Sequence, residues 1–202
     1  MPIERLLWFV STTAIFLISL TFHEYAHAWM AYRYGDDTAA RMGRLTLNPI
    51  AHISLLGTII LPLLVHFGWA KPVPVNFAVL TRNQMLKVAV AGPAANLLLA
   101  VGLTAVFHLF PLLWVVRRLG DLVRLAIVSN LMLAVFNLLP IPPLDGSRIV
   151  AAKLTSPNAI DAYRNFAQYG MLILLGFLYF GGFDVIVLPV VGVLYKLLGL
   201  PG

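Results

Sequence analysis

The sequence has 202 residues, of which 60% are hydrophobic and only 11% are charged, and its mean hydropathy is +0.90. Soluble domains carry roughly a quarter charged residues, so this composition excludes an ordinary soluble protein and predicts one that lies in a lipid bilayer. The net charge of +6 comes from 14 Lys and Arg that are scattered singly between apolar runs, which argues against a nucleic-acid-binding face.

Five apolar stretches are long enough to cross, or nearly cross, a bilayer core, which takes roughly 20 helical residues. They are residues 6–31, 87–110, 122–140, 166–181 and 184–199. The first begins like a signal peptide, but no small-residue cleavage site ends it, so we expect it to be retained. The last two are short and meet at Gly181 and Gly182, which favours a tight helical hairpin.

A sixth apolar run, residues 55–68, is too short to span the bilayer and contains a proline, so it predicts a re-entrant or interfacial segment. Alternation at residues 44–47 and the proline-rich residues 73–77 predict short extended strands. The expected fold is therefore an all-α polytopic membrane protein, a single domain over residues 1–202. It has about five to six transmembrane helices, the short re-entrant or interfacial segment, and small β-strand elements near the active site.

The motif His23-Glu24-Tyr25-Ala26-His27 lies within the first apolar stretch. Residues four apart lie on one face of a helix, about 6 Å apart along its axis, so the two imidazoles can bind one tetrahedral zinc ion. The chain has no cysteine, so such an ion would depend on histidine and carboxylate ligands. Glu24, beside the first histidine, would then take a proton from the attacking water. Hydrogen bonds between packed helices are the alternative interpretation of these polar residues.

Asp145 is the candidate third ligand, because catalytic zinc usually has three protein ligands and keeps one position open. It ends an otherwise uncharged run and follows prolines at 140, 142 and 143, which cannot sustain a regular helix. An ordinary Leu-Asp-Gly turn after a helix is the alternative. If residues 6–31 and 122–140 run parallel, with 87–110 crossing between them and 55–68 dipping in and returning, both motifs come out at the same depth.

The distribution of positive charge bears on this topology. The topology places ten Lys and Arg on one side of the membrane, namely Arg33, Arg41, Arg44, Lys71, Arg82, Lys87, Arg148, Lys153, Arg164 and Lys196. The remaining four, Arg5, Arg117, Arg118 and Arg124, face the opposite side. The excess predicts that the first side, where the two motifs lie, is cytoplasmic.

Three segments together resemble the core of the site-2 protease family of intramembrane metalloproteases: HEYAH, the segment AGPAAN at 91–96, and NLLPIPPLDG at 137–146. The intervening segments RLTLNPIAH and GWAKPVPVN resemble a compact bacterial subgroup without a PDZ or CBS domain. The resemblance therefore covers nearly the whole chain.

The resemblance implies a role for each matching residue. His23, His27 and Asp145 would bind one zinc ion. Glu24 would be the general base, and Asn137 would help to hold the substrate or the oxyanion. Relatives often have His-Ile-Asp where this sequence has His52-Ile53-Ser54, so any role of that aspartate is missing here.

Three further polar residues have two interpretations each. The amide of Asn137 could polarise a scissile carbonyl or bridge two helices. Asn96 lies in a small-residue stretch suited to close helix packing, which favours a structural role. His52 could approach the metal, although an interfacial position is favoured.

These residues predict an intramembrane zinc endopeptidase that cleaves in or near transmembrane segments of membrane proteins, in regulated intramembrane proteolysis or in clearance of signal-peptide remnants. The expected location is the bacterial cytoplasmic (inner) membrane, with the bilayer and a substrate transmembrane segment as partners and no nucleic acid. An unwound substrate would add as a strand at residues 44–47 and 73–77. The alternative is a non-hydrolytic metal-binding membrane protein such as a divalent-ion transporter, which should carry acidic or histidine residues on several spans.

Overall fold

The structure, a computed structural model, describes residues 3–54, 71–110 and 112–200. Three long helices dominate it: α1 (Ile3–Arg33), α4 (Arg82–Leu109) and α6 (Arg117–Asn137). The shorter helical elements are α2 (Thr38–Arg41), η1 (Pro49–His52), η3 (Phe77–Val79), α5 (Leu112–Val115), α7 (Asp145–Lys153), α8 (Pro157–Ala167), α9 (Gly170–Tyr179), η4 (Phe183–Val187) and α10 (Leu188–Leu197).

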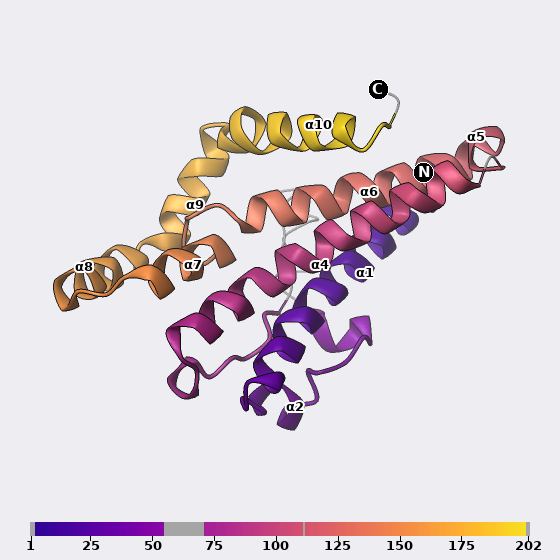
Figure 1. The fold of residues 1–202 in the computed structure, drawn as a ribbon. Helices are drawn as coiled ribbons and strands as arrows, with labels where there is room; N and C mark the ends of the chain where they lie inside the picture. Colours follow the sequence, from indigo (N-terminus) through magenta and orange to yellow (C-terminus); the bar gives the residue numbers. More distant parts are fainter. Residues whose placement is uncertain (1–2, 55–70, 111, 201–202) are drawn as a thin grey trace.

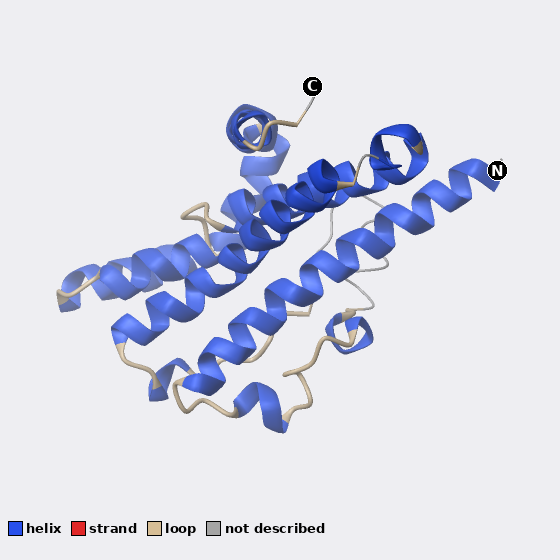
Figure 2. Ribbon diagram, turned by 45° about the vertical axis from the view of Figure 1, so that its right-hand side comes forward, coloured by secondary structure: helices blue, strands red, loops and turns tan. Residues whose placement is uncertain are grey.

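Helix α4 packs against both α1 and α6 and runs in the opposite direction to them (Figure 1). Helices α1 and α6 are therefore parallel, which is the condition under which the sequence analysis places the two motifs at the same depth. Their carboxyl-terminal halves lie at the same end of the bundle, where α2 and α7 also lie (labelled in Figure 1; Figure 2 shows the same bundle turned by 45°). This arrangement brings the HEYAH motif of α1 to the level of the chain that follows α6.

Small residues allow α1 and α4 to approach each other closely. Ala28 and Ala31 of α1 are fully buried, and Ala89, Ala91 and Gly92 are buried on α4. Alanine and glycine bring two helix backbones together where larger side chains would separate them. The close approach puts the backbone of α4 directly against the histidines of α1.

An apolar cluster holds the carboxyl-terminal elements onto the bundle. Phe107 of α4 and Ile127 of α6 are completely buried and pack with Val187 of η4 and Val191 of α10. Helix α10 consequently lies along α6 (Figure 1).

The described residues contain three helices long and apolar enough to cross a membrane, or four if the bent pair 170–179 and 183–197 counts as one span. This count is lower than the expected five to six. The pair is bent by 75° at a break where Gly181 has φ +74°, a conformation that favours glycine. Helix α9 has ten residues, so its length of about 15 Å covers half of a bilayer core. A bent pair thus replaces the predicted helical hairpin.

The expected β-strands are not found among the described residues. Residues 45–47 form bends, and residues 71–76 run as irregular chain up to η3. Pro72 and Pro74 have no N–H group and cannot donate to a strand ladder, which explains why this stretch forms no sheet. The predicted re-entrant segment, 55–68, lies outside the described residues.

Lys196 lies on a different side from the one predicted. The His108 ring, at the end of α4 far from the HEYAH motif, donates its Nε2 hydrogen to the carbonyl of Leu198, 3.2 Å away. Lys196, two residues earlier on α10, therefore lies at the same end as Arg117 and Arg118. The balance of Lys and Arg becomes nine against five rather than ten against four, so the excess is smaller but keeps its sign.

Candidate active site

Hydrogen bonds at the Nδ1 atoms hold the imidazole rings of His23 and His27 in one tautomer. His27 Nδ1 donates to the carbonyl of Val88 over 2.7 Å, and a carbonyl can only accept. His23 Nδ1 lies 2.6 Å from Oδ1 of Asn96. The amide of Asn96 is oriented in turn, because its Nδ2 donates to the carbonyl of Ser19 at 3.1 Å and to Oδ1 of Asn130 at 2.7 Å. When the rings are neutral, both Nε2 atoms therefore present lone pairs rather than protons.

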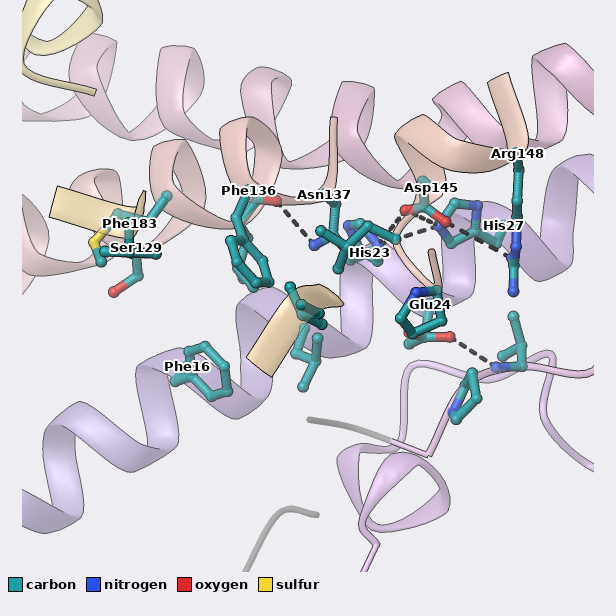
Figure 3. Close-up of a pocket in the computed structure, with 18 of the residues that line it drawn as sticks. Phe16, His23, Glu24, His27, Ser129, Phe136, Asn137, Asp145, Arg148 and Phe183 are labelled. Carbon is teal, nitrogen blue, oxygen red and sulfur yellow. Dashed lines mark hydrogen bonds and ion pairs between the residues drawn. The ribbon is translucent and has the colours of Figure 1, made fainter. Parts of the chain in front are cut away.

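Asp145 brings a third acceptor to these two nitrogens (Figure 3). Its Oδ2 atom lies 3.1 Å from His23 Nε2 and 3.0 Å from His27 Nε2, and the two nitrogens are 3.1 Å apart. All three residues are buried. Three acceptors that converge without a proton between them repel one another unless a cation lies among them.

The geometry fits a zinc ion. Ligand atoms at zinc bond lengths of 2.0–2.2 Å in a tetrahedral arrangement lie about 3.3 Å apart, close to the distances between these three atoms. Gly92 of α4 borders the same space: a Cβ atom there would overlap His27 Nε2 and lie 2.7 Å from His23 Nε2. Only glycine leaves this space open to an ion, because any side chain would fill it.

A second glycine fixes the position of Asp145, the first residue of α7. A Cβ atom on Gly146 would collide with the carbonyl oxygens of Leu138 and Leu139. Glycine therefore lets α7 begin directly against the end of α6. Asp145 then directs Oδ2 to the imidazoles, while its Oδ1 faces Arg148 Nη1 at 3.7 Å.

Glu24 is buried beside the two histidines, and its Oε2 accepts a hydrogen bond of 2.8 Å from the backbone N–H of Val73. Asn137 ends α6, and its Nδ2 donates to the carbonyl of Leu133 on the same helix at 2.9 Å, using one of two amide hydrogens. His52 is buried away from this group and donates from Nε2 to the carbonyl of Thr46 at 2.9 Å.

A cavity of about 570 Å³ opens on these groups (Figure 3). Its polar end holds the two histidines, Glu24, Asn137, Asp145 and Arg148. The rest of its wall is mostly apolar and is formed by Phe16, Leu20, Pro72, Val73, Met132, Leu133, Phe136, Pro143, Leu144, Met171, Leu174 and Phe183, with Ser129. The cavity can accept an apolar chain and bring it to the carboxylates and imidazoles.

Comparisons with known proteins agree with this geometry. The family described as Peptidase family M50 matches residues 11–115 and 114–180. The chain belongs to peptidase family M50. This family assignment confirms the resemblance to the site-2 proteases that the sequence motifs indicate.

Similar proteins come from bacteria and archaea. "Putative zinc metalloprotease YwhC" of Bacillus subtilis is 41% identical over 167 residues, which are 79% of this chain and 75% of that protein. "Putative zinc metalloprotease Rip2" of Mycolicibacterium smegmatis is 35% identical over 86% of this chain and 68% of its own length. "Zinc metalloprotease MJ0392" of Methanocaldococcus jannaschii is 25% identical over 75% of this chain and 36% of its own length. No solved structure matches the chain significantly.

The structure of this M50 peptidase adds residues that the sequence reasoning missed. Asn130 Nδ2 donates to Ser19 Oγ at 2.9 Å and to the carbonyl of Ala126 at 2.8 Å, completing the buried network behind His23. Asn96, for which helix packing was the favoured role, contacts the histidine itself. A search for amides within apolar helices would have found both asparagines, because such groups are costly in a membrane without partners. No sequence pattern indicates the Val73–Glu24 bond.

We predict that Gly92→Ala strongly weakens zinc binding, because the added methyl group occupies the space between the two Nε2 atoms. Zinc retained after dialysis against a chelator should fall by more than about tenfold. Tenfold is the lower end of the loss in metal affinity when residues that surround the metal ligands are changed. Gly102→Ala is the matched control on the same helix, since a Cβ atom there meets nothing within 4 Å. Equal zinc retention by the two variants would contradict the assignment.

Proposed function

We propose that this M50 peptidase is a zinc-dependent intramembrane endopeptidase that hydrolyses peptide bonds in or near transmembrane segments of membrane proteins. The observation that carries the proposal is the buried convergence of His23, His27 and Asp145, with Glu24 in the same apolar cavity. The relatives named as zinc metalloproteases support both the metal and the hydrolytic chemistry. A metal-binding protein without hydrolysis is not favoured, because the family is one of peptidases.

His23, His27 and Asp145 would hold the zinc ion, with one coordination position left open. Zinc bound there supplies a Lewis acid, which polarises the scissile carbonyl and makes water nucleophilic near neutral pH. Glu24 takes the proton of the attacking water and passes it to the leaving amine nitrogen. Its Oε2 is held by Val73 N–H, so Oε1 is the oxygen that transfers the proton.

Asn137 would assist from the end of α6. Its amide lines the cavity, and the hydrogen that is not donated to Leu133 can be donated to the substrate carbonyl or the developing oxyanion. The bond to Leu133 restricts the amide to a defined orientation. Preorganised donors of this kind stabilise the transition state more than mobile ones do.

The apolar wall of the cavity suits a transmembrane segment that is partly unwound, since a helix hides its carbonyls in internal hydrogen bonds. Strand addition along residues 73–77 would be restricted. Val73 N–H already bonds Glu24, Asn76 N–H bonds Asp36, and Pro74 has no N–H group. A substrate could therefore use mainly carbonyl groups of this stretch. Regulated intramembrane proteolysis and clearance of signal-peptide remnants both fit such a site.

We predict that Glu24→Gln keeps zinc but lowers cleavage of a tagged single-pass membrane substrate by about 10²–10⁴-fold, the usual contribution of general acid–base catalysis. Asp145→Ala should lose zinc and cleavage together, because it removes a ligand. Zinc analysis and cleavage assays on the purified proteins check both outcomes. Equal cleavage by the wild type and Glu24→Gln would refute the assigned base.

The proposed location is the bacterial inner membrane, with the active site toward the cytoplasm. The nine Lys and Arg that accompany the site against five at the far end support this orientation. The chain has no cysteine, so single cysteines can report the side of each segment.

In intact cells, a membrane-impermeant maleimide should label Val115→Cys, at the far end of the bundle, and should leave Asn158→Cys, at the start of α8, unlabelled. Both positions are exposed in the fold. Asn158→Cys should react once the inner membrane is permeabilised, and the cysteine-free chain is the control. The reverse labelling pattern would place the active site on the other side.

A further inference from the structure

Residues 71–76, referred to below as the 71–76 segment, form an irregular stretch that passes beside Glu24. Within the described residues, the Val73 N–H is the hydrogen-bond donor found for the Glu24 carboxylate, at 2.8 Å, and the bond appears as the dashed line from Glu24 in Figure 3. The place of Val73 therefore determines the orientation of the carboxylate.

Within this segment, Val73 has an N–H group while the residues on both sides of it have none. Pro72 and Pro74 flank it and have no N–H groups. A residue before proline is also restricted to extended conformations, so Val73 has few alternatives. The segment presents one N–H to Glu24 from a backbone with little conformational freedom.

Arg44 holds the start of the segment. Its Nη2 donates to the carbonyl of Lys71 and lies 3.5 Å from the carbonyl of Pro72. Arg44 is 6% exposed, and no carboxylate in the described ranges lies within ion-pair distance of it. A buried cation without an acidic partner is costly, so backbone carbonyls are its compensating contacts. These carbonyls belong to the two residues that precede Val73.

Other contacts hold the same segment in place. Asn76 N–H donates to Asp36 Oδ2 at 2.7 Å, and Lys71 N–H donates to the carbonyl of His52 at 3.1 Å. The side chain of Val73 packs with Ala28 of α1 and Ala39 of α2. The segment is thus anchored at both ends, with Val73 between the anchors.

We infer that Arg44 is a positioning residue for Glu24 and that it acts through the backbone of residues 71–73. The inference rests on the proposed function, in which Glu24 is the general base. Arg44 fixes the carbonyls of Lys71 and Pro72, these place the Val73 N–H, and that N–H holds Oε2 so that Oε1 faces the substrate. A displacement of about 1 Å in a catalytic group can reduce a rate by about 10²-fold, so loss of this anchor should lower kcat.

The first test compares Arg44→Met with Arg41→Met on zinc-loaded protein and a tagged transmembrane substrate. Arg41 is three residues away, has a side chain 77% exposed and pairs with Asp37, so it controls for the loss of a charge. Arg44→Met should lower kcat by about 10- to 100-fold, with one zinc per chain retained and KM nearly unchanged. Arg44→Lys keeps one donor and should recover part of kcat, while Arg41→Met should match the wild type.

The second test removes the N–H itself. Val73→Pro deletes the donor between two existing prolines, whereas Val73→Ala keeps the N–H and loses only side-chain packing. Val73→Pro should have a kcat at least about tenfold below that of Val73→Ala, with zinc retained in both.

Two results would overturn the inference. One is an Arg44→Met protein that binds zinc and has the kcat of Arg41→Met. The other is a loss of kcat that occurs only together with loss of zinc or a lower Tm, which would make Arg44 a structural anchor alone. Failure of the proposed function has a different signature: the wild type does not cleave, or Glu24→Gln cleaves equally well.

Discussion

Three hydrogen-bond acceptors converge inside an apolar helical bundle, and much of the structure serves to hold them there. Helix α1 supplies two imidazoles one turn apart, and the chain after α6 supplies the carboxylate of Asp145. Helix α4 supplies no ligand atom, but its Gly92 leaves the space and its Val88 carbonyl orients one ring. The parallel course of α1 and α6 is what brings the ligands to one depth. Without a cation between them, these three buried acceptors would repel one another and destabilise the folded state. A bound cation therefore stabilises the fold as well as the site.

The polar groups behind the histidines form a complete network at nearly full burial. Ser19, Asn96 and Asn130 come from three different helices, and hydrogen bonds pair their amides and hydroxyl with one another or with backbone carbonyls. A satisfied network of this kind fixes the packing of the three helices, whereas a half-satisfied one would be worse than an apolar core. The same bonds that set the tautomer of His23 therefore set the register between α1, α4 and α6.

Sequence reasoning singled out residues that the structure also brings together where the chemistry is local. The spacing of His23 and His27 and the place of Asp145 after an uncharged run follow from helix geometry and from the rarity of charge in a membrane. It failed where contacts between residues distant in the sequence determine the structure. The hydrogen bond between Val73 and Glu24 joins residues 49 positions apart, and no periodicity in the sequence indicates it. Alternation at 44–47 predicted a strand, but Arg44 is turned inward to bond the carbonyls of the 71–76 segment. The final two apolar stretches had the composition of spans, and only their bend and the His108–Leu198 contact show that Lys196 lies at the far end.

The most direct test of the central claim is X-ray absorption at the zinc edge of the purified protein. The geometry predicts a first shell with two imidazole nitrogens and a carboxylate oxygen at about 2.0–2.2 Å, and one imidazole fewer in His27→Ala. A shell without imidazole scattering, or a spectrum that His27→Ala leaves unchanged, would contradict the metal centre and the mechanism built on it.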